Sequence, residues 1–224
     1  MEDHQRNLDH LVRRVQRLGR RDRRVLLGIT GSPGAGKTTL ADDLADRINE
    51  TLGTNGRHAV HLPMDGYHLA NATLDRLGRR DRKGAIDTFD GWGFLALLRR
   101  LHDELDNPVY APSFERRLDE PVAGEIEIPP ETKFVIVEGN YLLVGQGPWA
   151  QIRSLLSESW FCETGEDERL RRLVTRHETF GRSHDAAKEW AVTVDGSNAE
   201  LIQPTRARAD LVVSGVTRQV LAGN

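Results

Sequence analysis

The stretch GSPGAGKT, residues 31–38, decides the fold because it fits the pattern G-x-x-x-x-G-K-[ST]. A short apolar run, residues 25–29, precedes it, and apolar residues at helical spacing follow it from about residue 37 to residue 52. A glycine-rich turn between a strand and a helix aims backbone N–H groups at phosphate oxygens, and the start of the helix adds partial positive charge. The stretch therefore predicts a phosphate-binding loop; the alternative interpretation is a glycine-rich turn that binds nothing.

The loop also predicts which side chains meet a nucleotide. In loops of this type the lysine reaches the β- and γ-phosphates, and the hydroxyl that follows it ligates Mg²⁺. We therefore expect ATP and Mg²⁺ as cofactors, with Lys37 and Thr38 in these two roles. The nucleotide-binding set that we expect comprises Gly31, Ser32, Pro33, Gly34, Ala35, Gly36, Lys37, Thr38 and Thr39. An N-K-x-D guanine motif and the protein-kinase motifs H-R-D and D-F-G are absent, which leaves small-molecule kinases, ATPase switches and transport ATPases.

Outward from the loop, strand and helix patterns alternate, which predicts an α/β fold with a mostly parallel central sheet flanked by helices. Residues 108–130 differ, because they form short pieces punctuated by proline. We interpret them as a hairpin excursion that carries site residues, and the whole of residues 1–224 as a single domain. The expected strands are residues 25–29, 59–62, 134–137, 159–162 and 211–213, and the expected helices are about residues 37–52, 92–106 and 166–180.

Two carboxylates follow strands that neighbour the loop. Asp65 comes just after the second expected strand, and Glu138 ends the third. Ligands of open parallel sheets bind beyond the carboxyl ends of the strands, where an aspartate can accept the proton of a substrate hydroxyl and a glutamate can hold Mg²⁺. The alternative for Asp65 is an Asx-turn with Gly66. For Glu138 an ionised group at the end of an apolar strand is costly unless it is paired or near a metal, which favours a functional role.

Arginines share one face of the expected helix at residues 166–180. Arg169, Arg172 and Arg176 recur at i, i+3 and i+7, and Arg182 follows after Gly181. Arginines on a mobile lid can stabilise the charge that develops in phosphoryl transfer, so we interpret residues 166–200 as a lid region. The alternative is a solvated run of charges paired with the glutamates and aspartates of the same helix.

The N-terminal residues 1–23 carry apolar side chains at positions 8, 11, 12, 15 and 18, which predicts an amphipathic helix. Acidic residues interrupt its basic face, which favours a helix packed on the domain over a membrane or nucleic-acid arm. The 224 residues have a net charge of −3 and one cysteine, Cys162, so neither a nucleic-acid partner nor an internal disulfide is indicated. No apolar run approaches the roughly 20 residues of a membrane span, and the N-terminus lacks the apolar core of a secretory signal, so we expect a cytoplasmic protein.

With these residues in place, the chain resembles the P-loop kinase family of uridine kinase, bacterial pantothenate kinase and phosphoribulokinase over about residues 24–214. It is most similar to the nucleoside/nucleotide-kinase-like branch, whose members are often labelled kinases of a fructose transport system. The resemblance implies a P-loop NTPase fold with a small lid. The matching segments are GSPGAGKTT (31–39), PMDGYH (63–68), DTFD (87–90), PVY (108–110), VEGNYLL (137–143), ERLRRLVTRHETFGR (168–182) and ADLVV (209–213).

The resemblance also implies roles for individual residues. Asp65 matches the acid that activates the acceptor hydroxyl, and Arg176 and Arg182 match lid arginines that contact the transferring phosphates. Lys37 with Thr38 and Glu138 match the phosphate and metal ligands. Arg172 is a weaker match to these lid arginines because the lid spacing differs by one residue. Tyr110 matches an aromatic residue of the acceptor pocket, and His68, Phe89, Phe114 and Arg116 are pocket candidates because they lie near these motifs. The acceptor-binding residues that we expect are Tyr67, His68, Phe89, Tyr110, Phe114, Arg116 and Arg172.

Two departures from uridine kinase argue against uridine as the acceptor. Its acid before the P-D-A-F-D segment is replaced by Lys83-Gly-Ala-Ile86, and its histidine after P-V-Y is replaced by Phe114-Glu-Arg116. Arg116 would suit an acceptor with a carboxylate or a phosphate. The leading hypothesis is thus an ATP-dependent kinase that phosphorylates an alcohol group of a small metabolite such as a sugar, a nucleoside or a pantothenate-like compound; relatives suggest a homodimer. The alternatives are a nucleotide-binding accessory protein of a sugar transport system and a nucleic-acid-stimulated ATPase.

Overall fold

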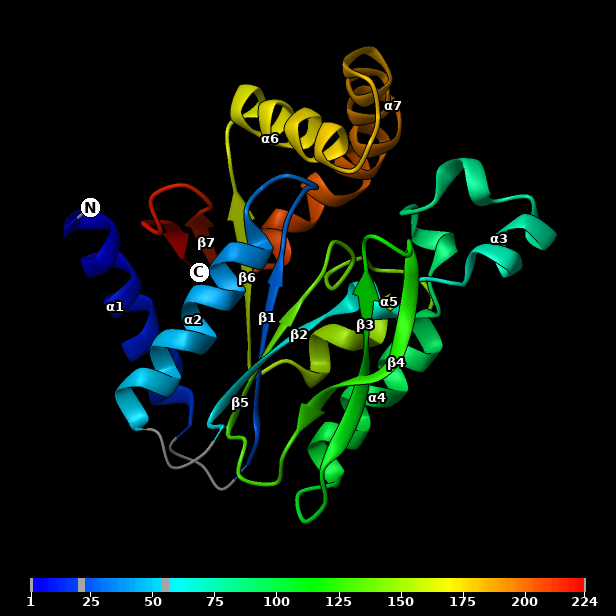
Figure 1. Ribbon diagram of the computed structural model, residues 1–224. Coiled ribbons are helices and arrows are strands. Elements are labelled where there is room, and N and C mark those ends of the chain that lie inside the picture. The colour runs from blue at the N-terminus through cyan, green and yellow to red at the C-terminus, as the bar shows by residue number, and fades with distance from the viewer. Residues whose placement is uncertain (1, 20–22, 54–56, 224) are drawn as a thin grey trace.

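A six-stranded sheet forms the centre of the computed structural model, which describes residues 2–19, 23–53 and 57–223 (Figure 1). Its strand order is β2-β5-β1-β6-β7-β8. All neighbouring strands pair in parallel except β8, which runs antiparallel to β7. This arrangement confirms the mostly parallel sheet expected from the sequence. The strands are β1 (Val25–Thr30), β2 (Ala59–Pro63), β5 (Phe134–Glu138), β6 (Glu158–Glu163), β7 (Leu211–Ser214) and β8 (Val220–Gly223).

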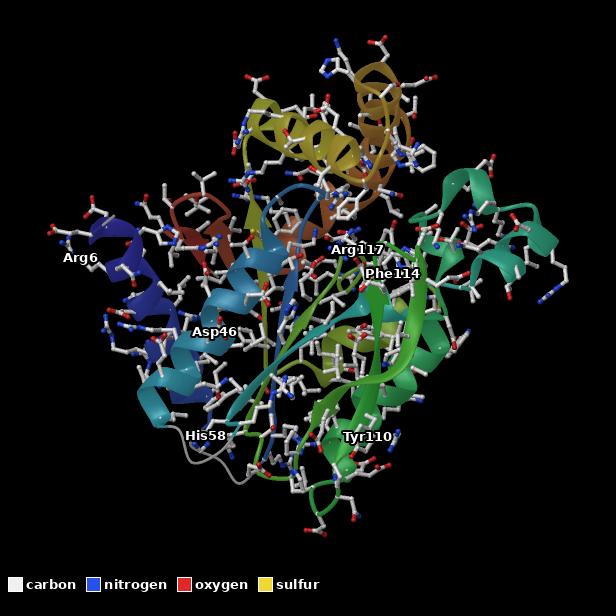
Figure 2. The ribbon with its side chains drawn as sticks, in the orientation of Figure 1. Arg6, Asp46, His58, Tyr110, Phe114 and Arg117 are labelled. Carbon is white, nitrogen blue, oxygen red and sulfur yellow. The ribbon has the colours of Figure 1, made fainter. Side chains whose placement is uncertain are left out.

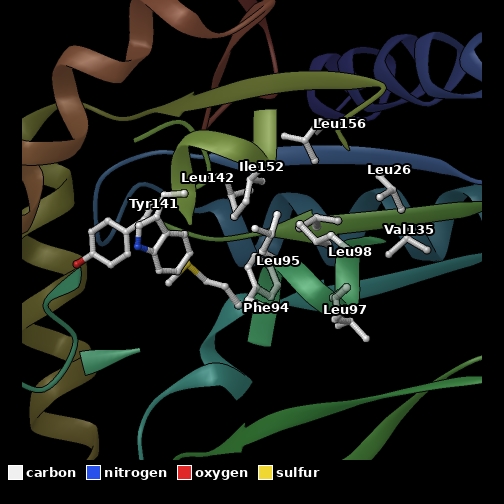
Figure 3. Packing of buried hydrophobic residues seen from close by; sticks show 14 of the residues in the cluster. Leu26, Phe94, Leu95, Leu97, Leu98, Val135, Tyr141, Leu142, Ile152 and Leu156 are labelled. Atoms are coloured by element: carbon white, nitrogen blue, oxygen red, sulfur yellow. The ribbon is translucent and has the colours of Figure 1, made fainter. Parts of the chain in front are cut away.

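The central strands β1 and β5 are almost wholly apolar because both faces of the sheet are covered. Alternate side chains of a strand point to opposite faces. Leu26 and Val135 therefore join the core beneath helix α4 (Gly91–Asp103), where Figure 3 shows them packed near Leu98. Leu27 and Ile136, one residue further along their strands, join the core on the other face.

Helices α1 (Glu2–Leu18) and α2 (Lys37–Leu52) pack against each other on that second face. Leu11 and Val15 of α1 are completely buried, and the arginines of α1 lie on its remaining faces. The amphipathic helix expected near the N-terminus is thus a packed helix of the domain. Residues 20–22 and residue 1 of the expected segment lie outside the described residues.

The hairpin expected at residues 108–130 forms a separate two-stranded sheet of β3 (Val109–Glu115) and β4 (Glu120–Ile128). It packs on the 3-10 turn η1 (Met64–Tyr67), which follows β2. The approach is so close that a Cβ atom on Gly66 would lie 2.0 Å from the Pro112 carbonyl oxygen. Glycine at this position therefore holds the hairpin beside Asp65.

Two helices above the carboxyl ends of the strands form the region expected to be a lid, α6 (Glu166–Thr179) and α7 (His184–Ile202) (Figure 1). They contact each other. The short helices α3 (Asn71–Leu77) and α5 (Trp149–Ile152) complete the structure. Among the described helices, none combines the length and the apolar character needed to cross a bilayer.

Candidate active site

The phosphate-binding loop joins β1 to α2 in a strained backbone that its glycines permit. Gly34 and Gly36 have φ angles of 81° and 95°, in the left-handed region that other residues avoid. Lys37, the first residue of α2, folds its side chain back over the loop and donates a hydrogen bond to the Ser32 carbonyl oxygen at 3.1 Å. Burial lowers the pKa of the Lys37 ammonium, which still has Glu138 Oε1 4.0 Å away. The loop thus holds a buried positive charge at the start of a helix.

Neighbouring elements fix the loop through its backbone. A Cβ atom on Gly31 would lie 2.3 Å from the Cys162 carbonyl oxygen of β6. A Cβ atom on Gly215, in the turn between β7 and β8, would lie 1.8 Å from the Ala35 carbonyl oxygen. The Thr164 hydroxyl donates a hydrogen bond to that same oxygen at 2.7 Å. Two glycines and one hydroxyl therefore clamp the loop from the side of β6 and β7.

A cluster of oxygen atoms lies beside the loop at the ends of β2 and β5. The Thr38 hydroxyl donates a hydrogen bond to Glu138 Oε2 at 3.3 Å, and Glu138 is buried. His61 of β2 lies behind this pair, with Nδ1 2.7 Å from Asp42 Oδ1 and Nε2 3.8 Å from Glu138 Oε2. Burial works against a charged imidazole, but the two carboxylates raise the pKa of His61 to about 9. Nε2 is buried and has no hydrogen-bond partner among the described residues.

These residues fit Mg²⁺-bound ATP. Magnesium prefers oxygen ligands and in kinases takes most of them from phosphates and water, so it needs only one or two protein oxygens. Thr38 and Glu138 supply such oxygens next to the loop, and the orphaned His61 nitrogen leaves a polar atom for a water of that shell. Within the described residues no group of three or more His, Cys, Asp or Glu side chains forms a metal site.

Asp65 lies on η1, just past the carboxyl end of β2, and faces the same cavity as Lys37. Arg116 from the hairpin reaches its carboxylate, with Nη2 3.5 Å from Oδ2. Burial alone would raise the pKa of Asp65, but the basic groups around it lower the pKa below the usual range. The carboxylate is therefore ionised at neutral pH and can accept a hydrogen bond from a hydroxyl group.

Aromatic rings form a wall next to Asp65. The imidazole of His68 lies between Phe89 and Phe114, with ring centroids 4.0 Å and 4.6 Å away. Its Nδ1 is 2.8 Å from the Asp65 carbonyl oxygen, so the imidazole is tied to the turn that carries the acid. Burial lowers the pKa of His68, which leaves this wall uncharged at neutral pH. Such a surface suits the carbon skeleton of a small molecule.

The lid brings three of the expected arginines to the cavity. Arg172 donates to Glu168 Oε1 at 2.7 Å and to the Gly215 carbonyl oxygen at 3.4 Å, on the loop side of the cavity. Arg176 Nη2 lies 4.0 Å from Asp195 Oδ1 of α7. Arg182 stacks on the ring of Trp190, with its guanidinium carbon 3.8 Å from the ring centroid.

The cavity between these elements has a volume of about 770 Å³, within the range of about 300–1,000 Å³ that is usual for ligand sites. Most of the residues expected to form a site line it, including the loop, both carboxylates, the aromatic wall and the lid arginines. The expected residues that line it are Pro33, Gly34, Gly36, Lys37, Thr38, Thr39, Asp65, His68, Phe89, Phe114, Arg116, Glu138, Arg172, Arg176 and Arg182.

Two expected acceptor contacts do not line the cavity. Tyr110 lies at the far end of β3 from Phe114, as Figure 2 shows, and 53% of its surface is exposed. Its hydroxyl is directed to Glu127, and Tyr110 lies apart from this cavity. Tyr67 packs against Phe94 and the core, because η1 turns its side chain away from Asp65. Among the loop residues, Gly31, Ser32 and Ala35 lie behind the cavity wall, and Ser32 donates to Gln203 Oε1 at 3.3 Å.

Three side chains at the site, His61, Lys83 and Arg218, were not expected from the sequence. His61 and Arg218 look like isolated residues in the sequence, yet Arg218 is buried, pairs with Asp43 at 2.7 Å and donates to the Gly215 carbonyl oxygen. Arg169 shares the arginine face but donates to the Pro33 carbonyl oxygen, so it supports the loop from behind. Lys83 lines the cavity over the Phe114 ring.

Comparison with known proteins agrees with this geometry. The model of the phosphoribulokinase / uridine kinase family matches residues 26–222. The crystal structure of a "putative fructose transport system kinase" from Silicibacter sp. TM1040 superposes with a TM-score of 0.82 and 36% identity, covering 92% of this chain and 98% of that one. The ATP-dependent kinase-like protein notR' of Aspergillus versicolor is 37% identical over 70% of this chain and 96% of its own length. Uridine kinase of Latilactobacillus sakei subsp. sakei is 31% identical over 84% of each chain.

Proposed function

This chain belongs to the phosphoribulokinase / uridine kinase family of ATP-dependent phosphotransferases that act on alcohol groups, and we propose that it phosphorylates a hydroxyl group of a small metabolite. ATP lies with its phosphates on the loop at residues 31–39, where Lys37 contacts the transferring end. Thr38 and Glu138 would hold Mg²⁺, which would neutralise part of the negative charge of the phosphates.

Asp65 is the residue that receives the acceptor. Its carboxylate orients the hydroxyl group toward the γ-phosphate and takes up its proton. The lowered pKa of Asp65 makes it a weak base, which suits a transfer whose transition state is loose and in which positioning counts for more than proton abstraction.

The lid arginines act on the other side of the transferred group. Arg176 lies in the same cavity as Lys37 and Asp65, on a helix that packs against the phosphate loop. Positive charge there stabilises the negative charge that spreads over the phosphoryl oxygens, and a closed lid keeps water from competing with the acceptor. Arg182, stacked on Trp190, lies in the turn between α6 and α7 and supports the same closure.

One observation carries the proposal: the ionised Asp65 shares a cavity with the loop lysine and the Thr38–Glu138 pair. A protein that only binds a nucleotide has no use for a carboxylate at the acceptor side. The neighbouring relatives carry kinase names, which supports the same conclusion.

ADP release from Mg²⁺-ATP tests the proposal. Purified protein is assayed with a library of sugars, nucleosides, hydroxy acids and their phosphate esters. We expect at least one acceptor to raise ADP release well above the rate in water alone, with one phosphate added per ADP formed. If ATP binds but no acceptor raises the rate, the kinase proposal fails and the protein is a nucleotide-binding accessory protein, for which the Silicibacter relative's name suggests a sugar transport system.

A further inference from the structure

Arg116 lies across the entrance to the acceptor side of the cavity. It projects from the turn of the hairpin and reaches the carboxylate of Asp65, with 3.5 Å between Nη2 and Oδ2. Its guanidinium carbon is 6.0 Å from the ring centroid of Phe180 at the end of the lid helix. One side chain of the hairpin therefore touches both the acid that receives the acceptor and the lid that closes over it.

Two other basic side chains on this side of the cavity pair with an aspartate other than Asp65. Arg80 and Lys83 both pair with Asp119 Oδ2, at 3.3 Å and 3.1 Å. Lys83 also donates to Asn71 Oδ1 at 2.6 Å, and only 9% of its side chain is exposed. Arg116 differs from both because its carboxylate partner is Asp65.

This pairing conflicts with the reaction. An acceptor hydroxyl has to reach the Asp65 carboxylate, and Arg116 Nη2 lies 3.5 Å from one of its two oxygens, Oδ2, so the arginine occupies one side of the approach to this carboxylate. A neutral acceptor either leaves Arg116 beside Asp65 or displaces it from Asp65 without offering the guanidinium another anion. An anionic group on the acceptor supplies that replacement, since a guanidinium pairs bidentately with a carboxylate or a phosphate.

We propose that the acceptor carries a carboxylate or phosphate group in addition to its reacting hydroxyl, and that Arg116 binds this group and releases Asp65. The inference rests on the proposed kinase function and names the substrate class within it. The uncharged wall of His68, Phe89 and Phe114 then receives the carbon skeleton between the two polar groups. The Phe180 contact places the bound anion where the lid closes.

Matched acceptors test the substrate class. Glycerol, fructose and uridine are compared with glycerate, glycerol 3-phosphate, fructose 6-phosphate and uridine monophosphate, at saturating Mg²⁺-ATP. We expect the best anionic compound to exceed its neutral partner at least tenfold in kcat/KM. The hydroxy-acid and phosphate-ester arms tell the two anion types apart. A neutral compound that matches or exceeds its anionic partners overturns the inference and leaves the kinase function intact.

Arg116→Gln tests the residue, with Arg117→Gln as the matched control. Arg117 is the next residue of the same turn, is exposed and does not line the cavity, so its replacement removes an equal charge without the proposed contact. We expect Arg116→Gln to raise KM for the anionic acceptor at least tenfold and Arg116→Lys to raise it less. Arg117→Gln should change it less than twofold. If Arg116→Gln lowers turnover of neutral and anionic compounds equally, Arg116 only positions Asp65 and the inference fails.

Binding without turnover separates this inference from the kinase proposal. Calorimetry with the Mg²⁺-ADP-bound protein measures the affinity for glycerate and glycerol 3-phosphate, with glycerol as the neutral probe. Arg116-dependent binding of the anions without any phosphorylation supports the anion site and overturns the kinase function. Equal affinity for all three compounds, or binding that Arg116→Gln leaves unchanged, overturns the anion site.

Discussion

Asp65 and Glu138 illustrate what individual residues of this sequence reveal. Each follows an apolar strand, and parallel strands end at one edge of the sheet, so a shared site could be predicted from position alone. Asp65 also faces the aromatic wall and the hairpin, whereas Glu138 does not. The residues around Asp65 in the sequence do not predict these neighbours. The pairing of Asp65 with Arg116 depends on residues 51 positions apart.

Replacing the acid tests its chemical role at the residue scale. Asp65→Asn keeps the shape of the side chain but removes the charge that accepts the hydroxyl proton. We expect kcat with the best acceptor to fall by about 100- to 10,000-fold, the usual effect of losing a general base. KM for ATP should change little, because the phosphate loop is untouched. A variant with normal kcat would show that Asp65 is only a turn residue.

His61 shows why some site residues could not be predicted from the sequence. A single histidine in an apolar strand has the appearance of a core residue. Its role depends on β2 and β5 lying side by side, which places it against Glu138, and on α2, which brings Asp42. Tyr110 is the opposite case, because its position in a family motif suggested a pocket that the hairpin turns it away from.

Cys162 provides a second test at the residue scale. The thiol is fully buried beside the phosphate loop and donates to the Ala35 carbonyl oxygen at 3.3 Å. Burial raises its pKa to about 11, so the unreactive thiol form prevails at neutral and mildly alkaline pH. We expect no labelling of the native protein by iodoacetamide at such pH and complete labelling after unfolding, measured by mass spectrometry. Rapid native labelling would contradict the packing described for β6.

At the scale of elements, helices α1, α2, α4 and α6 and most strands were predictable because their hydrophobic periods are regular, whereas helix α7 and strand β8 were not expected. The strand at residues 211–213 and the helix at residues 166–180 were located to within about one residue. The turn between β7 and β8 was not expected to matter, since residues 214–219 match no motif. It reaches the phosphate loop only because β7 lies next to β6 in the sheet.

Gly215→Ala tests that turn. The new Cβ atom would lie 1.8 Å from the Ala35 carbonyl oxygen and 2.9 Å from Cys162 Sγ, so the turn or the loop has to move. We expect a higher KM for ATP and a lower melting temperature, measured by kinetics and thermal unfolding. Gly165→Ala is the matched control, because a Cβ atom there meets nothing within 4 Å and its φ of −57° suits alanine. Equal behaviour of the two variants would contradict the clamp.

At the scale of the whole molecule, α1 closes the core on the face of the sheet that α2 covers. The periodicity of residues 5–19 predicted the helix, but the sheet order that gives it a place to dock depends on distant pairings. Leu11 of α1 is completely buried in this core. Leu11→Ala should therefore lower the free energy of unfolding by about 2–5 kcal/mol, as for other large-to-small core changes.

Urea unfolding followed by circular dichroism measures this loss. Arg13→Ala, on the exposed face of the same helix, is the control and should change stability by less than about 0.5 kcal/mol. A small loss for Leu11→Ala would mean that α1 is only loosely attached. Turnover per folded molecule should stay normal in both variants, because α1 contributes no residue to the cavity.

The hairpin and the turn it packs on belong to a single uninterrupted stretch of chain, between the end of β2 and the start of β5. That stretch contributes Asp65, the aromatic wall and Arg116, whereas the phosphate loop and its clamps come from before and after it. Recognition of the acceptor and handling of ATP are thus encoded in separable parts of the gene. Exchanging residues 64–133 for those of a relative should therefore change which acceptor is used, while the phosphate loop and the elements that clamp it stay unchanged.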